Sequence, residues 1–86
     1  MAYAVTFKAG ALRQLEKLPR ITARRIVAKA ASLSADPRPA GAVKLVGGGL
    51  WRVRVGDYRI VYLIDDARRS VDVRIVAHRR EVYRGM

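Results

Sequence analysis

Residues 50–62 read LWRVRVGDYRIVY, and this stretch decides the fold. Apolar residues that favour β-strands alternate with arginines on either side of Gly56-Asp57. A two-residue loop that begins with glycine is typical of a type II′ turn, so the sequence predicts a tight antiparallel hairpin of strands Leu50–Val55 and Tyr58–Ile64. Such a short loop also sets the register. The predicted pairs are Val55 with Tyr58, Arg54 with Arg59, Val53 with Ile60, and Arg52 with Val61.

The alternation gives this hairpin two different faces. The apolar face, which we expect to pack against helices, carries Trp51, Val53, Val55, Tyr58, Ile60 and Tyr62. The opposite face carries Arg52, Arg54 and Arg59. A last strand, Val71–Ala77, follows a polar turn and is predicted to extend both faces. It would add Val71, Val73, Ile75 and Ala77 to the core side, and Arg74 and His78 to the arginine side.

The residues before the hairpin predict a strand and a first helix. Ala2–Phe7 alternates and is rich in β-formers, which is typical of a short strand. Leu12, Leu15 and Leu18 then follow helical spacing. Pro19 is predicted to end that helix at about Leu18, because proline cannot donate a backbone hydrogen bond.

A second helix is predicted to start at Thr22, a suitable N-cap, and to run to about Ser34. The connection between the helices is short, so we expect them to form an antiparallel hairpin. The element order β-α-α-β-β-β predicts an α+β fold, with this helical hairpin packed on one face of a mostly antiparallel four-stranded sheet. A length of 86 residues predicts a single domain, residues 1–86.

Composition narrows the classes of function. The 18 Lys and Arg residues exceed the 7 Asp and Glu residues by 11, and 14 of the 18 are arginine. This excess favours a polyanionic partner, either nucleic acid or an acidic protein, although a merely soluble basic surface has the same composition. With 0 cysteines and 1 histidine, we expect no metal site and no cofactor. No apolar run is long enough for a membrane span, so we expect a cytoplasmic protein.

The arginine side of the hairpin is the first candidate site. Arg54 directly across from Arg59 is a like-charge pair, which lowers stability unless an anion lies between the two side chains. Guanidinium groups bind phosphate in a planar, two-pronged manner. We therefore expect a phosphate site, and the alternative is a solvated face that carries long charged side chains.

The residues after the last strand are the second candidate site. His78 has a reference pKa near neutrality and is either a proton carrier or a strand-end histidine bonded to a backbone carbonyl. Tyr83 offers a phenol for hydrogen bonding or acid–base chemistry, and its alternative role is to anchor the tail. On charge, we expect contacts with RNA phosphates from Lys17, Arg25, Lys29, Lys44 and Arg74, and contacts with an acidic protein at Arg13, Arg24 and Arg25.

Residues 50–62, together with VAHRREVY at residues 76–83, resemble the RelE/ParE toxin superfamily, and its RelE branch in particular. The length, the first strand and Lys44-Leu45 before the glycines fit as well. The resemblance implies a toxin of a type II toxin–antitoxin system. Its activity would be metal-independent, ribosome-dependent cleavage of mRNA through attack by the 2′-hydroxyl. The implied partners are an acidic, RelB-like antitoxin and mRNA on the ribosome. The alternatives are a ParE-like, non-enzymatic inhibitor of DNA gyrase and a plain RNA-binding protein.

By position, the resemblance also implies a catalytic set. It comprises Arg52, Arg54, Arg59, Arg79 and Tyr83, with His78 as a substitute for proton transfer. Some members of the family carry lysines where this chain has Arg52 and Arg54. An arginine does not give up its proton readily, because its pKa exceeds ~12. The two arginines should therefore act electrostatically, and proton transfer falls to Tyr83, His78 or a group of the ribosome.

Overall fold

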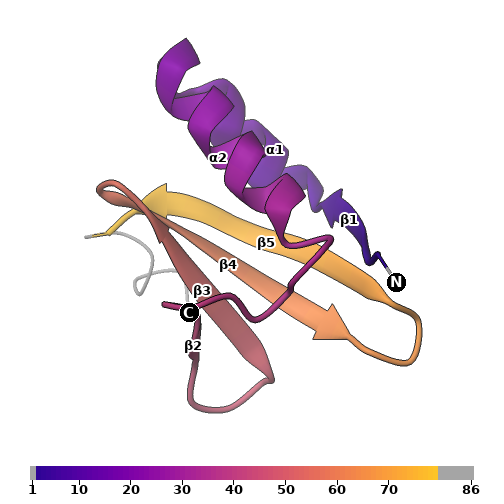
Figure 1. Cartoon of the computed structure of the whole chain (residues 1–86). Coiled ribbons are helices and arrows are strands. Elements are labelled where there is room, and N and C mark those ends of the chain that lie inside the picture. Colours follow the sequence, from indigo (N-terminus) through magenta and orange to yellow (C-terminus); the bar gives the residue numbers. More distant parts are fainter. Residues whose placement is uncertain (1, 80–86) are drawn as a thin grey trace.

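The structure is a computed structural model that describes residues 2–79 (Figure 1). The elements are β1 (Ala4–Phe7), α1 (Ala9–Glu16), α2 (Arg20–Ser32), β2 (Val43–Lys44), β3 (Leu50–Val55), β4 (Tyr58–Asp65) and β5 (Ser70–His78). One sheet runs in the order β1-β5-β4-β3-β2, in which β1 is parallel to β5 and the other pairs are antiparallel. Both helices lie over one face of this sheet, with α1 against β5 and α2 against β3. The predicted α+β fold is confirmed, with five strands rather than four, because Val43–Lys44 adds a short edge strand.

The helix boundaries differ slightly from the prediction. α1 ends at Glu16, before Leu18. Pro19, rather than Thr22, occupies the N-cap position of α2. The carbonyl of Pro19 accepts the first helical hydrogen bond from the N–H of Ala23 at 2.9 Å, and the fixed φ of proline suits the entry to a helix. Pro19 therefore begins the second helix, whereas α1 has already ended at Glu16 with Lys17 as its C-cap.

The β3–β4 hairpin has the register predicted from its loop. Val55 pairs with Tyr58, and Arg54 pairs with Arg59. Gly56 has a φ of 58°, whereas the φ of Asp57 is not positive, which is the pattern of a type II′ turn. The predicted apolar face also packs on the helices, since Val53 and Ile60 share a core cluster with Ile26 of α2.

The predicted faces of β5 are wrong beyond Val73. A β-bulge places Val61 opposite Ile75 but Tyr62 opposite Val73, so Arg74 is the extra residue. The alternation is reversed after it. Val76 therefore belongs to the helix-side core, and Ile75 and Ala77 pack with Val61 on the opposite face.

Tyr62 is the largest fully buried side chain of the described core. Its hydroxyl donates a hydrogen bond to the carbonyl oxygen of Pro37 at 2.7 Å, which attaches the segment after α2 to the centre of the sheet. Burial raises the pKa of Tyr62 from 10.0 to about 12, because the charged phenolate is poorly solvated there. Among residues 2–79, no helix has the length and apolar character that a membrane span requires.

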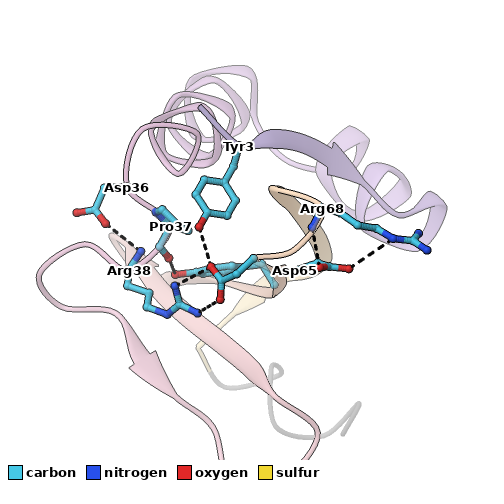
Figure 2. A network of polar contacts seen from close by, with 8 residues as sticks. Tyr3, Asp36, Pro37, Arg38, Asp65 and Arg68 are labelled. Carbon is cyan, nitrogen blue, oxygen red and sulfur yellow. Dashed lines mark hydrogen bonds and ion pairs between the residues drawn. The ribbon is translucent and has the colours of Figure 1, made fainter. Parts of the chain in front are cut away.

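A polar network joins three distant segments at one end of the sheet (Figure 2). The guanidinium of Arg38 donates to both carboxylate oxygens of Asp66, at 3.2 and 2.8 Å, and the hydroxyl of Tyr3 donates to Asp66 Oδ1 at 2.7 Å. The Arg38 guanidinium also lies 5.3 Å from the ring centroid of Trp51. The hydrogen bonds from Arg38 and then Tyr3 lower the pKa of Asp66 from 3.8 to about 2. Asp66 therefore connects Tyr3, just before β1, and the α2–β2 segment to the β4–β5 turn.

Replacing Asp66 with Asn should reduce the loss of thermal stability that the wild-type protein shows as the pH falls toward 2. The pKa of this carboxyl is lower in the folded chain, about 2, than its ordinary value of 3.8. Its contribution to stability is therefore complete above pH 3.8 and is lost as the pH falls from 3.8 to about 2. Thermal unfolding, followed from neutral pH down to pH 2, measures the difference between Asp66→Asn and wild type. Glu16→Gln, which removes an exposed carboxylate from α1, is the charge-matched control, and equal acid losses in all three proteins would contradict the assignment.

Candidate nucleic-acid interface

Arginines gather on the sheet face that the helices leave uncovered, which we call the arginine face. Arg54 and Arg59 are directly paired across β3 and β4, and Arg52 lies two residues before Arg54 on the same side of β3. The floor beneath them is apolar. It consists of Val61 and Ala77, packed against Leu45, Leu50 and Ile75. An apolar floor lowers the local dielectric constant, so the cations attract an anion more strongly there than in open solvent.

The arginines of this face differ in their exposure. Arg54 is exposed, whereas Arg59 is only 7% exposed, and its Nη1 donates to the carbonyl oxygen of Tyr58 at 3.3 Å. The Nε of Arg52 is buried and has no hydrogen-bond acceptor among the described residues. A buried donor without an acceptor is destabilising by about 1–3 kcal/mol. The geometry of this face therefore suits an anion that supplies oxygen acceptors between the guanidinium groups.

Two further arginines lie near this face. Arg74, on the bulge, donates from Nε to Asp72 Oδ2 at 2.6 Å, so much of its charge is already compensated. Arg79 is exposed, and its backbone N–H donates to the carbonyl of Asp57 at 2.7 Å. This bond brings the start of the tail to the tip of the β3–β4 hairpin. Tyr83 lies outside the described residues.

His78 does not lie on the arginine face, contrary to the sequence prediction. It pairs with Tyr58, whose side chain faces the helices, and paired residues of an antiparallel ladder point to the same side. The two rings make an edge-to-face contact, with centroids 5.5 Å apart and an interplanar angle of 81°. The bulge in β5 causes this reversal. Lys44 is likewise paired with Trp51, so it lies on the side opposite Arg52.

The basic residues of the helices form a separate surface. Arg13 and Lys17 lie on and just after α1, and Arg24, Arg25 and Lys29 lie on α2. The helical layer is on the other side of the sheet from the arginine face, so the structure does not combine the two sets. Arg25 approaches the hairpin, where its guanidinium lies beside Gly56. Within residues 2–79, no group of three or more His, Asp or Glu side chains is arranged to hold a metal ion.

Comparison with known proteins agrees with this architecture. Residues 5–83 match the family model described as the ParE toxin of type II toxin–antitoxin systems. Toxin RelG of Mycobacterium tuberculosis is 37% identical over 86 residues, which cover 98% of this chain and 99% of the relative.

Solved structures share the fold as well. The toxin–antitoxin complex RelBE2 from Mycobacterium tuberculosis contains a chain with 33% identity and a TM-score of 0.82, covering 91% of this chain and 99% of that one. The archaeal RelE–RelB complex from Pyrococcus horikoshii gives 28% identity and a TM-score of 0.82, covering 92% and 97%. Both structures are complexes of a toxin with its antitoxin.

Proposed function

This chain belongs to the RelE/ParE family of toxins of type II toxin–antitoxin systems, and from that premise we propose that it is an endoribonuclease that cleaves mRNA on the ribosome. The observation that carries the proposal is the arginine face. Arg54 and Arg59 are forced together by the hairpin register, and the buried Nε of Arg52 lacks an acceptor among residues 2–79. A phosphodiester placed there relieves the repulsion and supplies the acceptor.

The proposed reaction needs stabilisation of negative charge more than any other assistance. The 2′-hydroxyl of the RNA loses its proton and attacks the adjacent phosphorus, and the bond from phosphorus to the 5′-oxygen breaks. The products are a 2′,3′-cyclic phosphate and a 5′-hydroxyl, which takes up a proton. Arg52, Arg54 and Arg59 would stabilise the additional charge on the phosphate oxygens in the transition state, and Arg79 would approach from the hairpin tip.

Proton transfer in this proposal does not involve the arginines or His78. Arginine stays protonated at physiological pH, and His78 lies on the helix side of the sheet. Asp72 is already bonded to Arg74 and is a weak candidate for a base. Tyr83, or a group of the ribosome, is left to accept and return the proton. This shortage of acid–base groups on the arginine face within residues 2–79 is the reason to propose that cleavage depends on the ribosome. Lys17, Arg25, Lys29 and Lys44 are then phosphate contacts to its RNA.

The chemistry of the nucleic-acid ends in expressing cells tests the proposed activity. We expect growth arrest together with mRNA fragments that end in 2′,3′-cyclic phosphate and begin with 5′-hydroxyl. Sequencing of RNA ends after induction measures both. DNA breaks with a DNA-damage response, and intact mRNA, would instead indicate gyrase inhibition of the ParE type. Binding of RNA with neither arrest nor cleavage would indicate a plain RNA-binding protein.

The proposal includes an acidic antitoxin as the partner. The outer surface of the helices combines the cations Arg13, Arg24 and Arg25 with exposed apolar side chains, and the similar solved structures are toxin–antitoxin complexes. Those apolar residues are Leu12, Ile21 and Val27. An acidic amphipathic segment would neutralise these arginines and bury these apolar side chains. Co-expression with each neighbouring gene should therefore suppress the growth arrest in one case and yield a co-purifying complex.

A further inference from the structure

β5 extends past the end of β1, and a cleft lies beside the extension. β1 pairs with β5 only from Ser70 to Val73. Beyond that point α1 covers the strand, and Gln14 Oε1 accepts a hydrogen bond from the N–H of Val76 at 2.9 Å. Between α1 and the strand ends lies a cavity of about 420 Å³, which we call the helix-side cleft. Its walls include Gln14, Lys17, Leu18, Tyr58, Val76 and His78.

The helix-side cleft combines aromatic, apolar and cationic groups. The rings of Tyr58 and His78 are both half-buried and meet edge to face, so neither ring is stacked flat on the other. Lys17, at the C-cap of α1, adds a positive charge at the rim. Aromatic faces beside a cation are the combination with which proteins hold single-stranded nucleic acid, because every base stacks and every phosphate is anionic. The volume is within the range of about 300–1,000 Å³ typical of small-ligand sites.

A second hollow, of about 250 Å³, lies at the tip of the hairpin and shares Tyr58 with the helix-side cleft. Its other lining residues include Thr22, Arg25 and the Gly56-Asp57 turn. Arg25 therefore supplies a further cation at the same end of the sheet. Asp57 is the one acidic side chain lining either hollow within the described part of the chain.

The cleft and the arginine face meet at this end of the molecule. His78 lines the cleft, and the next residue, Arg79, is bonded through its backbone to Asp57 at the hairpin tip. Arg54 and Arg59 occupy the other side of the same hairpin, next to the turn. A single strand bound on the arginine face thus has a short path over the tip into the cleft.

We propose that the helix-side cleft is a second nucleotide-binding site for single-stranded RNA. The base of a nucleotide next to the cleaved one stacks on Tyr58 and His78. Its phosphate binds Lys17, in place of the contact with ribosomal RNA proposed for that residue above. This inference rests on the proposed function and deepens it, because it assigns the cleft to the same RNA substrate. It also gives His78 a binding role in place of the proton transfer expected from the sequence.

Equilibrium binding of 2′-O-methyl RNA tests the site, because the blocked 2′-oxygen cannot attack the phosphate. For an oligonucleotide longer than the arginine face, we expect His78→Ala and Tyr58→Leu each to bind about tenfold more weakly. Tyr58→Phe should bind like wild type, because the ring is retained. A dinucleotide can occupy either site but cannot span both, so it should lose less affinity in these variants than the longer RNA does. Fluorescence anisotropy measures both affinities, and thermal unfolding identifies any variant that has lost its fold.

The charge contribution has its own matched pair of variants. Lys17→Ala should reduce the slope of log Kd against log salt concentration by about 0.7 for the longer RNA, the value for one phosphate contact to a single strand. Lys8→Ala, at the opposite end of α1, removes the same charge away from the cleft and should leave that slope unchanged.

Cross-linking provides a readout that does not depend on variant stability. RNA containing 4-thiouridine should cross-link to the peptides that carry Tyr58 and His78 in the wild-type protein. Cross-links confined to residues 52–54, with wild-type affinity in the cleft variants, would overturn the inference. If Arg54→Ala weakens RNA binding in that same series, the proposed function survives this failure; if Arg54→Ala binds normally, the proposed function fails as well. Loss of affinity for an acidic protein partner alone would assign the cleft to protein docking and would also overturn the inference.

Discussion

Arg54→Ala is expected to cleave ribosome-bound mRNA about 10²–10³-fold more slowly than wild type, the effect of removing one donor aimed at a developing oxyanion. The same substitution should raise the unfolding temperature at low ionic strength, because Arg54 is paired directly with Arg59 and the two cations repel each other. Single-turnover cleavage and thermal unfolding, measured on one preparation, test both expectations. A solvated sheet face without function predicts the increase in stability and no change in activity.

Arg54 is the most informative of these arginines because it is exposed. Arg59 is only 7% exposed, so Arg59→Ala confounds activity with folding. Arg54→Lys retains the charge but loses the planar, two-pronged donor, so it should recover only part of the activity that Arg54→Ala loses. Arg68→Ala is the control for net charge, because Arg68 is exposed in the β4–β5 turn, at the other end of the sheet from Gly56-Asp57. Wild-type cleavage by Arg54→Ala would remove the arginine face from the mechanism.

The pairing of Arg54 with Arg59 was predictable from the sequence because a local feature determines it. A two-residue loop that starts with glycine permits few geometries, and the register of the six residues before it follows from the turn. The helix-facing residues of β3 and β4 follow from the same reasoning, since side chains alternate along a strand.

The position of His78 was not predictable by that reasoning. One extra residue at Arg74 reverses every later side chain of β5, and strict alternation has no means of placing a bulge. The sequence does hold a signal, because Ile75, Val76 and Ala77 are three consecutive apolar residues. In a strand with one polar face, apolar and polar residues are expected to alternate. The bulge allows Val76 to join the helix-side core while its neighbours cover the opposite face.

The network around Asp66 escaped prediction for a different reason. Tyr3 and Asp66 are 63 residues apart in the chain, and no local pattern indicates that they meet. The edge strand Val43–Lys44 was also missed, because its two residues lie between a proline-rich loop and a run of three glycines. It is held by its ladder with Arg52 and Trp51, so it depends on the hairpin rather than on its own propensity.

Tyr62→Ala is expected to lower the free energy of unfolding by about 3–5 kcal/mol, the usual loss for a buried aromatic side chain. This is a large fraction of the roughly 5–15 kcal/mol typical of a small domain, and equilibrium denaturation by urea measures it. Tyr62 is 0% exposed, and its hydroxyl donates the hydrogen bond that the buried carbonyl oxygen of Pro37 accepts. Tyr62→Phe keeps the ring, so its loss should be limited to about 1–3 kcal/mol for the buried carbonyl left without a donor.

The hydroxyl of Tyr62 should also define the alkaline limit of stability. Its pKa rises from 10.0 in the unfolded chain to about 12 in the folded one, so the neutral phenol stabilises the fold fully below pH 10. That contribution disappears as the pH rises from 10 to about 12, and Tyr62→Phe should lack this part of the alkaline loss. Tyr62 faces the helices, whereas the arginine face lies on the other side of the sheet. Tyr62→Phe should therefore cleave RNA at the wild-type rate near neutral pH, and a loss of cleavage there, in a folded variant, would show that the two faces of the sheet are coupled.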